Sequence, residues 1–348
     1  MPDNVGETFY YGEIPWHKKG TRLEAPATAT EAIKAGGLDW TVSLVPIQTE
    51  ERKPREITRR VAVVRDDIES GDPRAVLGVV HPEFCPLQNR DAVKVFDALL
   101  TAGQSSQQSG NPPPQRLYHT GGYLGNGEVI WMLARLPKTI AIAGKDDVVE
   151  SYMLLTNSHD GTFAISFRLT TVRVVCQNTL ALAMRGDKSS HVFRSAHKIG
   201  PAKLAAEAKE FYQFSTKTAA EVGETFQKMH RKQFGPDQLE SLVAKLLPLP
   251  RPPADGSVAL SVRRQYDTRV QKITEARKGI VTVFAEGCRN GLEIPPAEET
   301  LWGALNAVTA FVDHKQEISG DRYAYMLFGS GATLKQKAYD LVLAQLPK

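Results

Sequence analysis

The sequence predicts an α+β fold, in which an antiparallel β-meander sheet packs against helices and the C-terminal half is largely helical. Two observations carry this prediction. Two hairpin signals lie between residues 117 and 175, and apolar stripes with helical spacing follow from residue 201 onward. Strands gathered first and helices second are typical of an α+β arrangement and not of a doubly wound parallel sheet.

Residues 1–101 are expected to form an N-terminal α/β region. A helix is predicted over residues 89–101, because Val93, Phe96 and Leu100 share one helical face. Three short strands should precede it, near residues 40–48, 57–65 and 75–81. Residues 102–116 follow with three successive prolines and no apolar periodicity, so they are expected to form a flexible loop.

Residues 117–246 are expected to form the meander core and a long helix. Gly125-Asn126-Gly127 suits the positive φ angles of a hairpin connection, and Asn157–Gly161 is a second turn of residues that tolerate left-handed backbone. The helix after Pro201 carries an apolar stripe that should break near Ser215. The expected strands are residues 117–124, 128–136, 151–156 and 162–170.

Residues 247–257 are predicted to be a proline-rich linker, since proline in a helix interior removes an amide donor and clashes with the preceding turn. Residues 258–348 are predicted to be helical. Their apolar stripes run over Val270–Phe284, Leu301–Val312 and Leu334–Val342.

The last strand of the meander carries the most information about function. Phe163 and Phe167 alternate onto one face, which we expect to be buried, and Arg168 falls on the other. The parity of the apolar residues then slips, and a one-residue bulge at Thr170-Thr171 would repair it. That bulge would place Arg173 on the face of Arg168.

A short helix is expected next, capped by Gln177-Asn178 and ended by Gly186. From Arg168 to Lys203 there are seven Lys or Arg residues and one acid, with aromatic residues between them. Single-strand binders use such strips to neutralise phosphates and stack bases, whereas a solvated sheet face with Phe193 in the core is an equal alternative. The predicted nucleic-acid-binding residues are Arg168, Arg173, Arg185, Lys188, Phe193, Arg194 and Lys198.

Recognisable catalytic and metal-binding motifs are missing, so we predict no catalytic residue, no metal and no cofactor. Three features give weaker signals of chemistry or binding. His159-Asp160 marks a hairpin tip that could expose an acid–base pair. His81 and Cys85 could give two zinc ligands, although a turn with a buried thiol is preferred. The basic stretch 263–269 could hold phosphates, although solvation of its helix is somewhat preferred.

Gly329–Thr333, followed by Lys335, superficially suggests a phosphate-binding loop. The required ending of glycine, lysine and a hydroxyl residue is absent. A glycine loop before a helix that Thr333 caps is therefore the preferred interpretation, although a helix N-terminus can bind phosphate through its free amides.

The net charge of +4 is too small to establish a polyanionic partner, so the placement of the charges matters most. Three widely spaced cysteines argue against a disulfide framework and favour a reducing compartment. Neither a secretion signal nor a membrane-spanning stretch is evident, so we expect a cytoplasmic protein with no membrane association.

The segment HDGTFAISFRLTTVRVVCQNTLALAM resembles the signature of the phage/plasmid-like protein family, catalogued as domain of unknown function 932. Further stretches resemble the other motifs of that family: Pro15–Gly20, Leu38–Val42, Leu301–Thr309 with Asp313-His314, and Gly329–Leu341. The family's association with mobile elements implies DNA metabolism, recombination or interplay with host defence. In architecture alone, the meander, helix and basic strip are also similar to phage single-strand annealing proteins.

We therefore expect a non-catalytic protein that binds single-stranded DNA, plausibly an annealing or recombination accessory of a phage or plasmid that forms a homo-oligomer. The alternatives are an enzyme that acts on nucleic acid or nucleotides and a protein-binding inhibitor of host defence.

Overall fold

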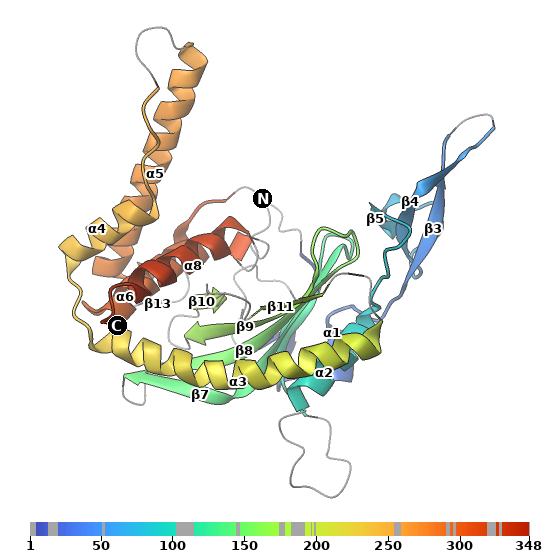
Figure 1. The fold of residues 1–348 in the computed structure, drawn as a ribbon, viewed down its shortest axis with the longest axis horizontal. Coiled ribbons are helices and arrows are strands. Elements are labelled where there is room, and N and C mark those ends of the chain that lie inside the picture. Colours follow the sequence, from blue (N-terminus) through green and yellow to red (C-terminus); the bar gives the residue numbers. More distant parts are fainter. Residues whose placement is uncertain are drawn as a thin grey trace, which may run out of the picture. The chain divides into compact units, whose positions relative to one another are not determined.

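The computed structural model of the 348-residue chain divides into two compact units, each assembled from separate segments (Figure 1). Unit 1 comprises Met1–Lys138, Ser151–Thr170 and Gly186–Ala219, and unit 2 comprises Thr139–Glu150, Thr171–Arg185 and Ala220–Lys348. The structure describes residues 5–12, 20–50, 53–101, 115–143, 147–173, 178–181, 192–195, 197, 200–253, 259–289, 293–294, 297–318, 325–326 and 329–347.

The largest sheet contains the predicted antiparallel meander. Its strand order is β10-β9-β8-β7-β6-β1-β2, and β11 also pairs with β9. The pairing of β1 with β2 is parallel, whereas β1 with β6 and β6 with β7 are antiparallel. The strands are β1 (Val5–Tyr11), β2 (Thr21–Leu23), β6 (Tyr118–Leu124), β7 (Val129–Ala143), β8 (Asp147–Ser158), β9 (Ile165–Arg173), β10 (Asn178–Ala181) and β11 (Val192–Ser195).

The β6–β7 hairpin confirms the turn predicted from its glycines. Gly125 and Gly127 adopt φ angles of 64° and 119°, in the left-handed region that glycine reaches without steric cost. Leu124 pairs with Val129 at the start of the ladder. Strands β7 and β8 run several residues beyond the predicted ends at 136 and 151, so the sequence pattern underestimated their length.

One face of this sheet is buried under helices in unit 1. Helix α1 (Ala29–Ala35) begins with a capping box, in which Thr28 and Glu31 bond each other's backbone amides. Helix α2 (Asn89–Thr101) occupies the predicted range and buries Phe96 in the same cluster as Phe167 and Leu204. The face is thus covered by helices of the first half and by the start of α3 (Pro201–Arg231).

A second, three-stranded sheet has the order β3-β4-β5 and is antiparallel. Its strands lie at the three positions that the sequence predicted. They are β3 (Val42–Gln48), β4 (Glu56–Arg65) and β5 (Val76–Val80), with the short helix η1 (Pro73–Ala75) before β5. Val63 and Leu77 turn into the core of unit 1.

Unit 2 is built around a separate helical core. Trp302 and Tyr339 both contact Phe226 of α3 within it. The remaining elements are α4 (Pro236–Leu246), α5 (Leu260–Glu286), β12 (Cys288–Arg289), β13 (Glu293–Ile294), α6 (Leu301–Ala310), the π-helical turn η2 (Phe311–Lys315) and α8 (Ser330–Leu343). The proline-rich stretch separates α4 from α5, as predicted.

Two expectations about regular structure were wrong. Asn178–Ala181 is strand β10 and not the start of a helix, because pairing within the sheet satisfies its backbone and outweighs the capping signal. Helix α3 is continuous through Ser215. Its interior contains no proline after Pro201 and a single glycine, so nothing in it forces a break.

Candidate nucleic-acid interface

The ladder between β9 and β11 holds the part of the predicted site that the structure describes. Its register pairs Phe193 with Phe167 and Arg194 with Ser166, and Arg168 stands opposite Val192. Directly opposed residues of antiparallel strands share a face of the sheet. Arg168 and Arg194 therefore occupy positions on one face, about 7–8 Å apart along the diagonal, and Phe193 occupies a position on the other.

The face of Phe167 is the buried one. Phe167 has no exposed surface, and its ring stacks on Phe96 at 5.7 Å between centroids and an angle of 20°. The position of Phe193 in the register thus lies on the face that the core of unit 1 covers. Its side chain is outside the described residues, so its role in stacking remains a prediction.

Phe163 is a correction to the sequence prediction, because it is 44% exposed and precedes the strand. A tight loop holds it there. Oδ1 of Asp160 accepts hydrogen bonds from the amide and the hydroxyl of Thr162, and Gly161 takes a φ of 76°. Oγ of Ser158 then bonds the backbone of Phe163. The strand begins only after this loop, at Ile165.

The face of Arg168 is covered at one end and more accessible at the other. The hydroxyls of Ser166 and Thr156 lie 2.5 Å apart, and both residues are buried. Arg168 is partly exposed. Nε of Arg168 is nevertheless buried, and Ser166 contributes to internal packing.

Several predicted residues cannot be placed in this way. The side chains of Arg173 and Arg194 lie outside the described residues, although both backbones are in strands. Arg185, Lys188 and Lys198 lie outside them entirely. The bulge at Thr170-Thr171 also remains a prediction, because the register of that stretch is not described.

His159 is buried, so it does not form the exposed acid–base pair that its hairpin tip suggested. Its Nε2 lies 2.9 Å from Oδ1 of Asn89. Because that amide oxygen can only accept, Nε2 carries the proton. Burial, with the nearby charges of His197 and Arg65, lowers the pKa of His159 to about 3. The ring is therefore neutral at physiological pH and serves the packing of unit 1.

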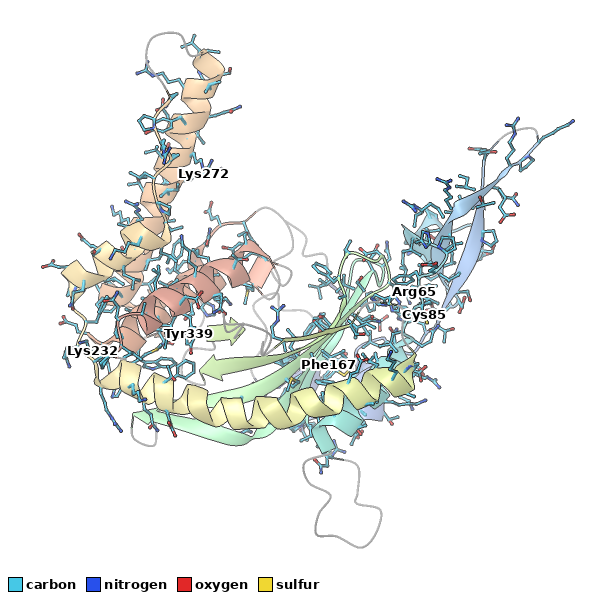
Figure 2. The ribbon with its side chains drawn as sticks, in the orientation of Figure 1. Arg65, Cys85, Phe167, Lys232, Lys272 and Tyr339 are labelled. Carbon is cyan, nitrogen blue, oxygen red and sulfur yellow. The ribbon has the colours of Figure 1, made fainter. Side chains whose placement is uncertain are left out.

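A stacked cation borders this histidine. The guanidinium carbon of Arg65 lies 4.2 Å from the ring centre of Trp40, and the Trp40 ring lies 5.3 Å from that of His159. Two further hydrogen bonds, 2.9 and 2.7 Å long, run from Arg65 to the carboxylate of Asp67 and lower its pKa. With both interactions made, Arg65 (labelled in Figure 2) is a structural residue and not a free phosphate ligand.

His81 and Cys85 were considered as zinc ligands, and a turn with a buried thiol was preferred. Cys85 is exposed, which corrects the expected buried thiol, and His81 lies beside Glu83 at 3.8 Å. No group of three or more His, Cys, Asp or Glu side chains that could hold a metal ion occurs among the described residues. No helix among them is long and apolar enough to cross a membrane.

The supposed phosphate loop before α8 also has a structural role. Lys335 is buried, and its Nζ lies 2.6 Å from Oδ1 of Asp313. The hydroxyl of Thr333 donates to the carbonyl of Gly329, so it is not the cap of the helix. The lysine is therefore committed to a carboxylate and cannot reach a phosphate.

The first half of α5 carries the second basic stretch on an exposed surface. Arg263, Arg264, Arg269 and Lys272 are exposed, and Figure 2 labels Lys272 on this half. Among the described residues, none of the four side chains is in an ion pair or a hydrogen bond. They are therefore the free cations that a phosphate backbone could use.

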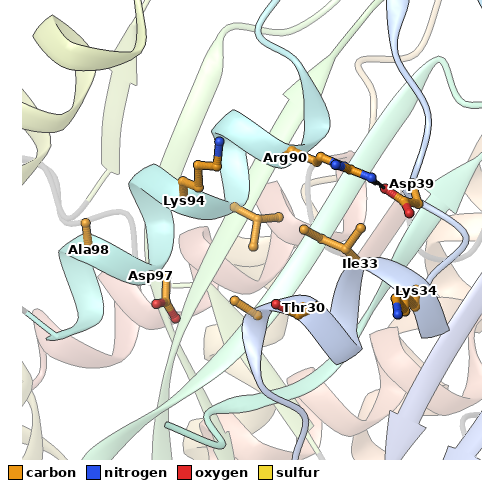
Figure 3. A pocket seen from close by; sticks show the side chains of 10 residues that line it. Thr30, Ile33, Lys34, Asp39, Arg90, Lys94, Asp97 and Ala98 are labelled. Carbon is orange, nitrogen blue, oxygen red and sulfur yellow. Dashed lines mark hydrogen bonds and ion pairs between the residues drawn. The ribbon is translucent and has the colours of Figure 1, made fainter. Parts of the chain in front are cut away.

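A pocket of about 590 Å³ lies between α1 and α2 (Figure 3). Ile33 and Val93 line it together with charged residues of both helices. Arg90 is paired with Asp39 at 2.5 Å, and Lys94 with Asp91 at 3.3 Å. No sequence motif marks this pocket, because it forms only through the tertiary contact of two helices. Arg90 and Lys94 are thus neutralised by neighbouring carboxylates, and Lys34 and Asp97 add one charge of each sign to the lining.

These features define an α+β protein with a meander sheet, a partly described arginine-bearing ladder and, among the described residues, no metal cluster. The chain belongs to the family described as a domain of unknown function (DUF932), whose model matches residues 76–338. No curated protein and no solved structure gave a match.

Proposed function

We propose that this chain binds single-stranded nucleic acid through the face of the β9–β11 ladder that carries Arg168 and Arg194. The observation that supports this is the register, which places both arginines on the face opposite Phe167. Arginines at these positions would hold successive phosphates. Arg173, Arg185, Lys188 and Lys198 extend the basic strip in the sequence and belong to the same proposal.

The proposed setting is a cytoplasmic annealing or recombination accessory of a phage or plasmid, acting on single-stranded DNA as a homo-oligomer. Single-strand binders often oligomerise, because one protomer covers only a few nucleotides. The burial of His159 gives no support to an enzyme that uses it, and no observation favours an inhibitor of host defence.

Fluorescence anisotropy with a labelled single-stranded oligonucleotide at several salt concentrations tests the proposal. Each phosphate contact should contribute about −0.7 to the slope of log affinity against log salt. The double variant R168A/R194A should therefore make the slope less negative by about 1.4, and R173A alone by about 0.7. R59A/R60A, which removes two exposed arginines of β4, is the matched control.

Phe193→Ala separates the two roles open to that residue. If Phe193 stacks on a base, the variant should bind more weakly by about 1–3 kcal/mol with an unchanged salt slope. If it packs on the core face, it should lose stability and keep its affinity. Failure of the folded wild-type protein to bind at low salt would remove the proposed function.

A further inference from the structure

The second half of helix α5 packs into the core of unit 2, whereas the first half is exposed. Ile280, Val283 and Phe284 are buried in the core of unit 2. Near the start of the helix, Leu260 is 75% exposed and Val262 is 45% exposed. Figure 1 shows this first half extending beyond α4 and α6 of the same unit. About three turns of helix therefore stand in solvent with their side chains available to a partner.

Helical geometry gathers three of the four free cations of this half on one side, whereas Arg263 lies outside that arc. At about 100° per residue, Arg264, Lys272 and Arg269 fall within an arc of about 140°. The apolar stripe that begins at Val262 and continues through Tyr266 occupies a separate arc. Along the axis, Arg264 and Lys272 are about 12 Å apart at 1.5 Å per residue. The exposed half thus carries a basic track beside its apolar stripe.

These cations are not explained by the stability of the helix. Positive charge near a helix N-terminus opposes the macrodipole, and the first turn of α5 contains no acidic residue to balance Arg263 and Arg264. The nearest acid in the sequence, Asp267, makes no ion pair with either of them. A partner with negative charge would relieve this repulsion.

The chemistry of the arc favours a phosphate backbone over a protein surface. Ser261 and Gln265, both exposed and polar, lie among the three cations, and no apolar residue of this half falls within the arc. Phosphate contacts come from Arg, Lys, Ser and Gln side chains, whereas a protein interface would need a hydrophobic centre.

We propose that the first half of α5 is a second nucleic-acid contact, in which Arg264, Arg269 and Lys272 hold the phosphates of a single strand. The inference rests on the proposed function and adds a surface in unit 2 to the ladder in unit 1. A protein with two such surfaces could hold two strands at once, as annealing requires.

The test compares full-length wild type with R264A/R269A/K272A in the same anisotropy assay. Loss of three phosphate contacts should make the slope of log affinity against log salt less negative by about 2. Alanine favours helix, so α5 should remain folded, which circular dichroism checks. The matched control is R231A/K232A/K245A, which removes three exposed cations of unit 2 that make no ion pair with any described residue.

The inference is supported if the salt slope of the triple variant is less negative by about 2 and that of the control is unchanged. An unchanged slope in the triple variant, with normal wild-type binding, overturns it and leaves the proposed function standing. An equal change of the salt slope in both variants also overturns it, because the effect would then come from the change in net charge and not from specific phosphate contacts. If R168A/R194A leaves the slope unchanged while the α5 variant makes it less negative, the ladder proposal fails and the α5 contact stands.

Discussion

The ammonium group of Lys335 lies 2.6 Å from Oδ1 of Asp313, and the two side chains are 1% and 0% exposed. The pair joins α8 to the π-helical turn that follows α6. Both residues belong to the C-terminal segments that resemble the family's motifs. Those segments therefore meet in the core of unit 2, where each charge needs the other to remain buried.

Removing one partner of this pair should be far more harmful than removing both. Lys335→Met leaves the carboxylate of Asp313 buried without its cation, and we expect a loss of about 3–5 kcal/mol in the free energy of unfolding. The double variant D313L/K335M buries no charge and should recover most of that loss. Urea denaturation measures both. If the free energy of unfolding of Lys335→Met lay within about 0.5 kcal/mol of the wild-type value, the two charges would not be coupled.

Acid should destabilise unit 1 through His159. Its pKa is about 3 in the folded chain and near 6.5 when unfolded, so the unfolded state takes up the proton first. The stabilisation is complete above about pH 6.5 and is lost as the pH falls toward 3. At pH 5 the loss should be about 2 kcal/mol.

His159→Gln is the control, because its amide can still donate to Asn89 and does not titrate in this range. Urea midpoints at pH 7.5 and pH 5 should fall less in this variant than in wild type. His197, whose pKa burial also lowers, titrates in both proteins and cancels from the comparison. Equal falls would show that His159 has no part in the acid sensitivity.

Two cations close the C-terminal end of α4. Arg277 of α5 donates to the carbonyls of Ala244 and Leu247, and Lys337 of α8 donates to that of Leu246. These carbonyls belong to the last turn and its cap, where intrahelical donors are lacking. Arg277→Met should cost about 1.5–3 kcal/mol.

Lys278→Met is the matched control for that variant. Lys278 is the next residue, is exposed, and makes no hydrogen bond or ion pair among the described residues. Thermal unfolding of the two variants should differ clearly. If both lose the same stability, the bonds to α4 contribute nothing beyond side-chain packing.

Gly122 has no room for a side chain. A methyl group there would meet the carbonyl of Glu7 and the backbone of Thr8 on the neighbouring strand β1. Gly122→Ala should therefore push β1 from β6 and cost about 1–3 kcal/mol. Gly200→Ala meets nothing within 4 Å and should be close to neutral. Equal stabilities would show that β1 can yield at little cost.

Strong local signals predicted much of this fold. The periodicity of α2 gave both of its ends, and Gly125-Asn126-Gly127 gave the first hairpin. The sequence did not reveal the parallel pairing of β1 with β2. The two strands are close in the chain but are not joined by a hairpin, so no local turn signal indicates that they pair. The sequence also did not reveal β10, where pairing in the sheet overrode a capping pattern.

The candidate site was harder to predict, because alternation along the sequence assigns residues to the two faces of a sheet only within the bounds of the strand. Phe163 was assigned to the strand, but the bonds of Asp160 and Ser158 hold it in the preceding loop. The place of Arg194 beside Arg168 depends on the pairing of β11 with β9, which links residues far apart in sequence. The arginines of α5 were visible as a stretch whose solvation was the preferred interpretation, and their exposure agrees with that interpretation.

The division of the chain also bears on how this protein can be produced and dissected. Each unit draws on three separate segments, and the backbone passes from one unit to the other five times, at residues 138/139, 150/151, 170/171, 185/186 and 219/220. A fragment that ends at residue 219 contains all of unit 1 but also two segments of unit 2, and a fragment that begins at residue 139 contains all of unit 2 but also two segments of unit 1, so no single cut yields either unit by itself. Nascent unit 1 must wait for residues up to 219 before it can complete its core, which favours slow, late folding on the ribosome. Mapping by deletion will therefore mislead, and point substitutions are the appropriate tools.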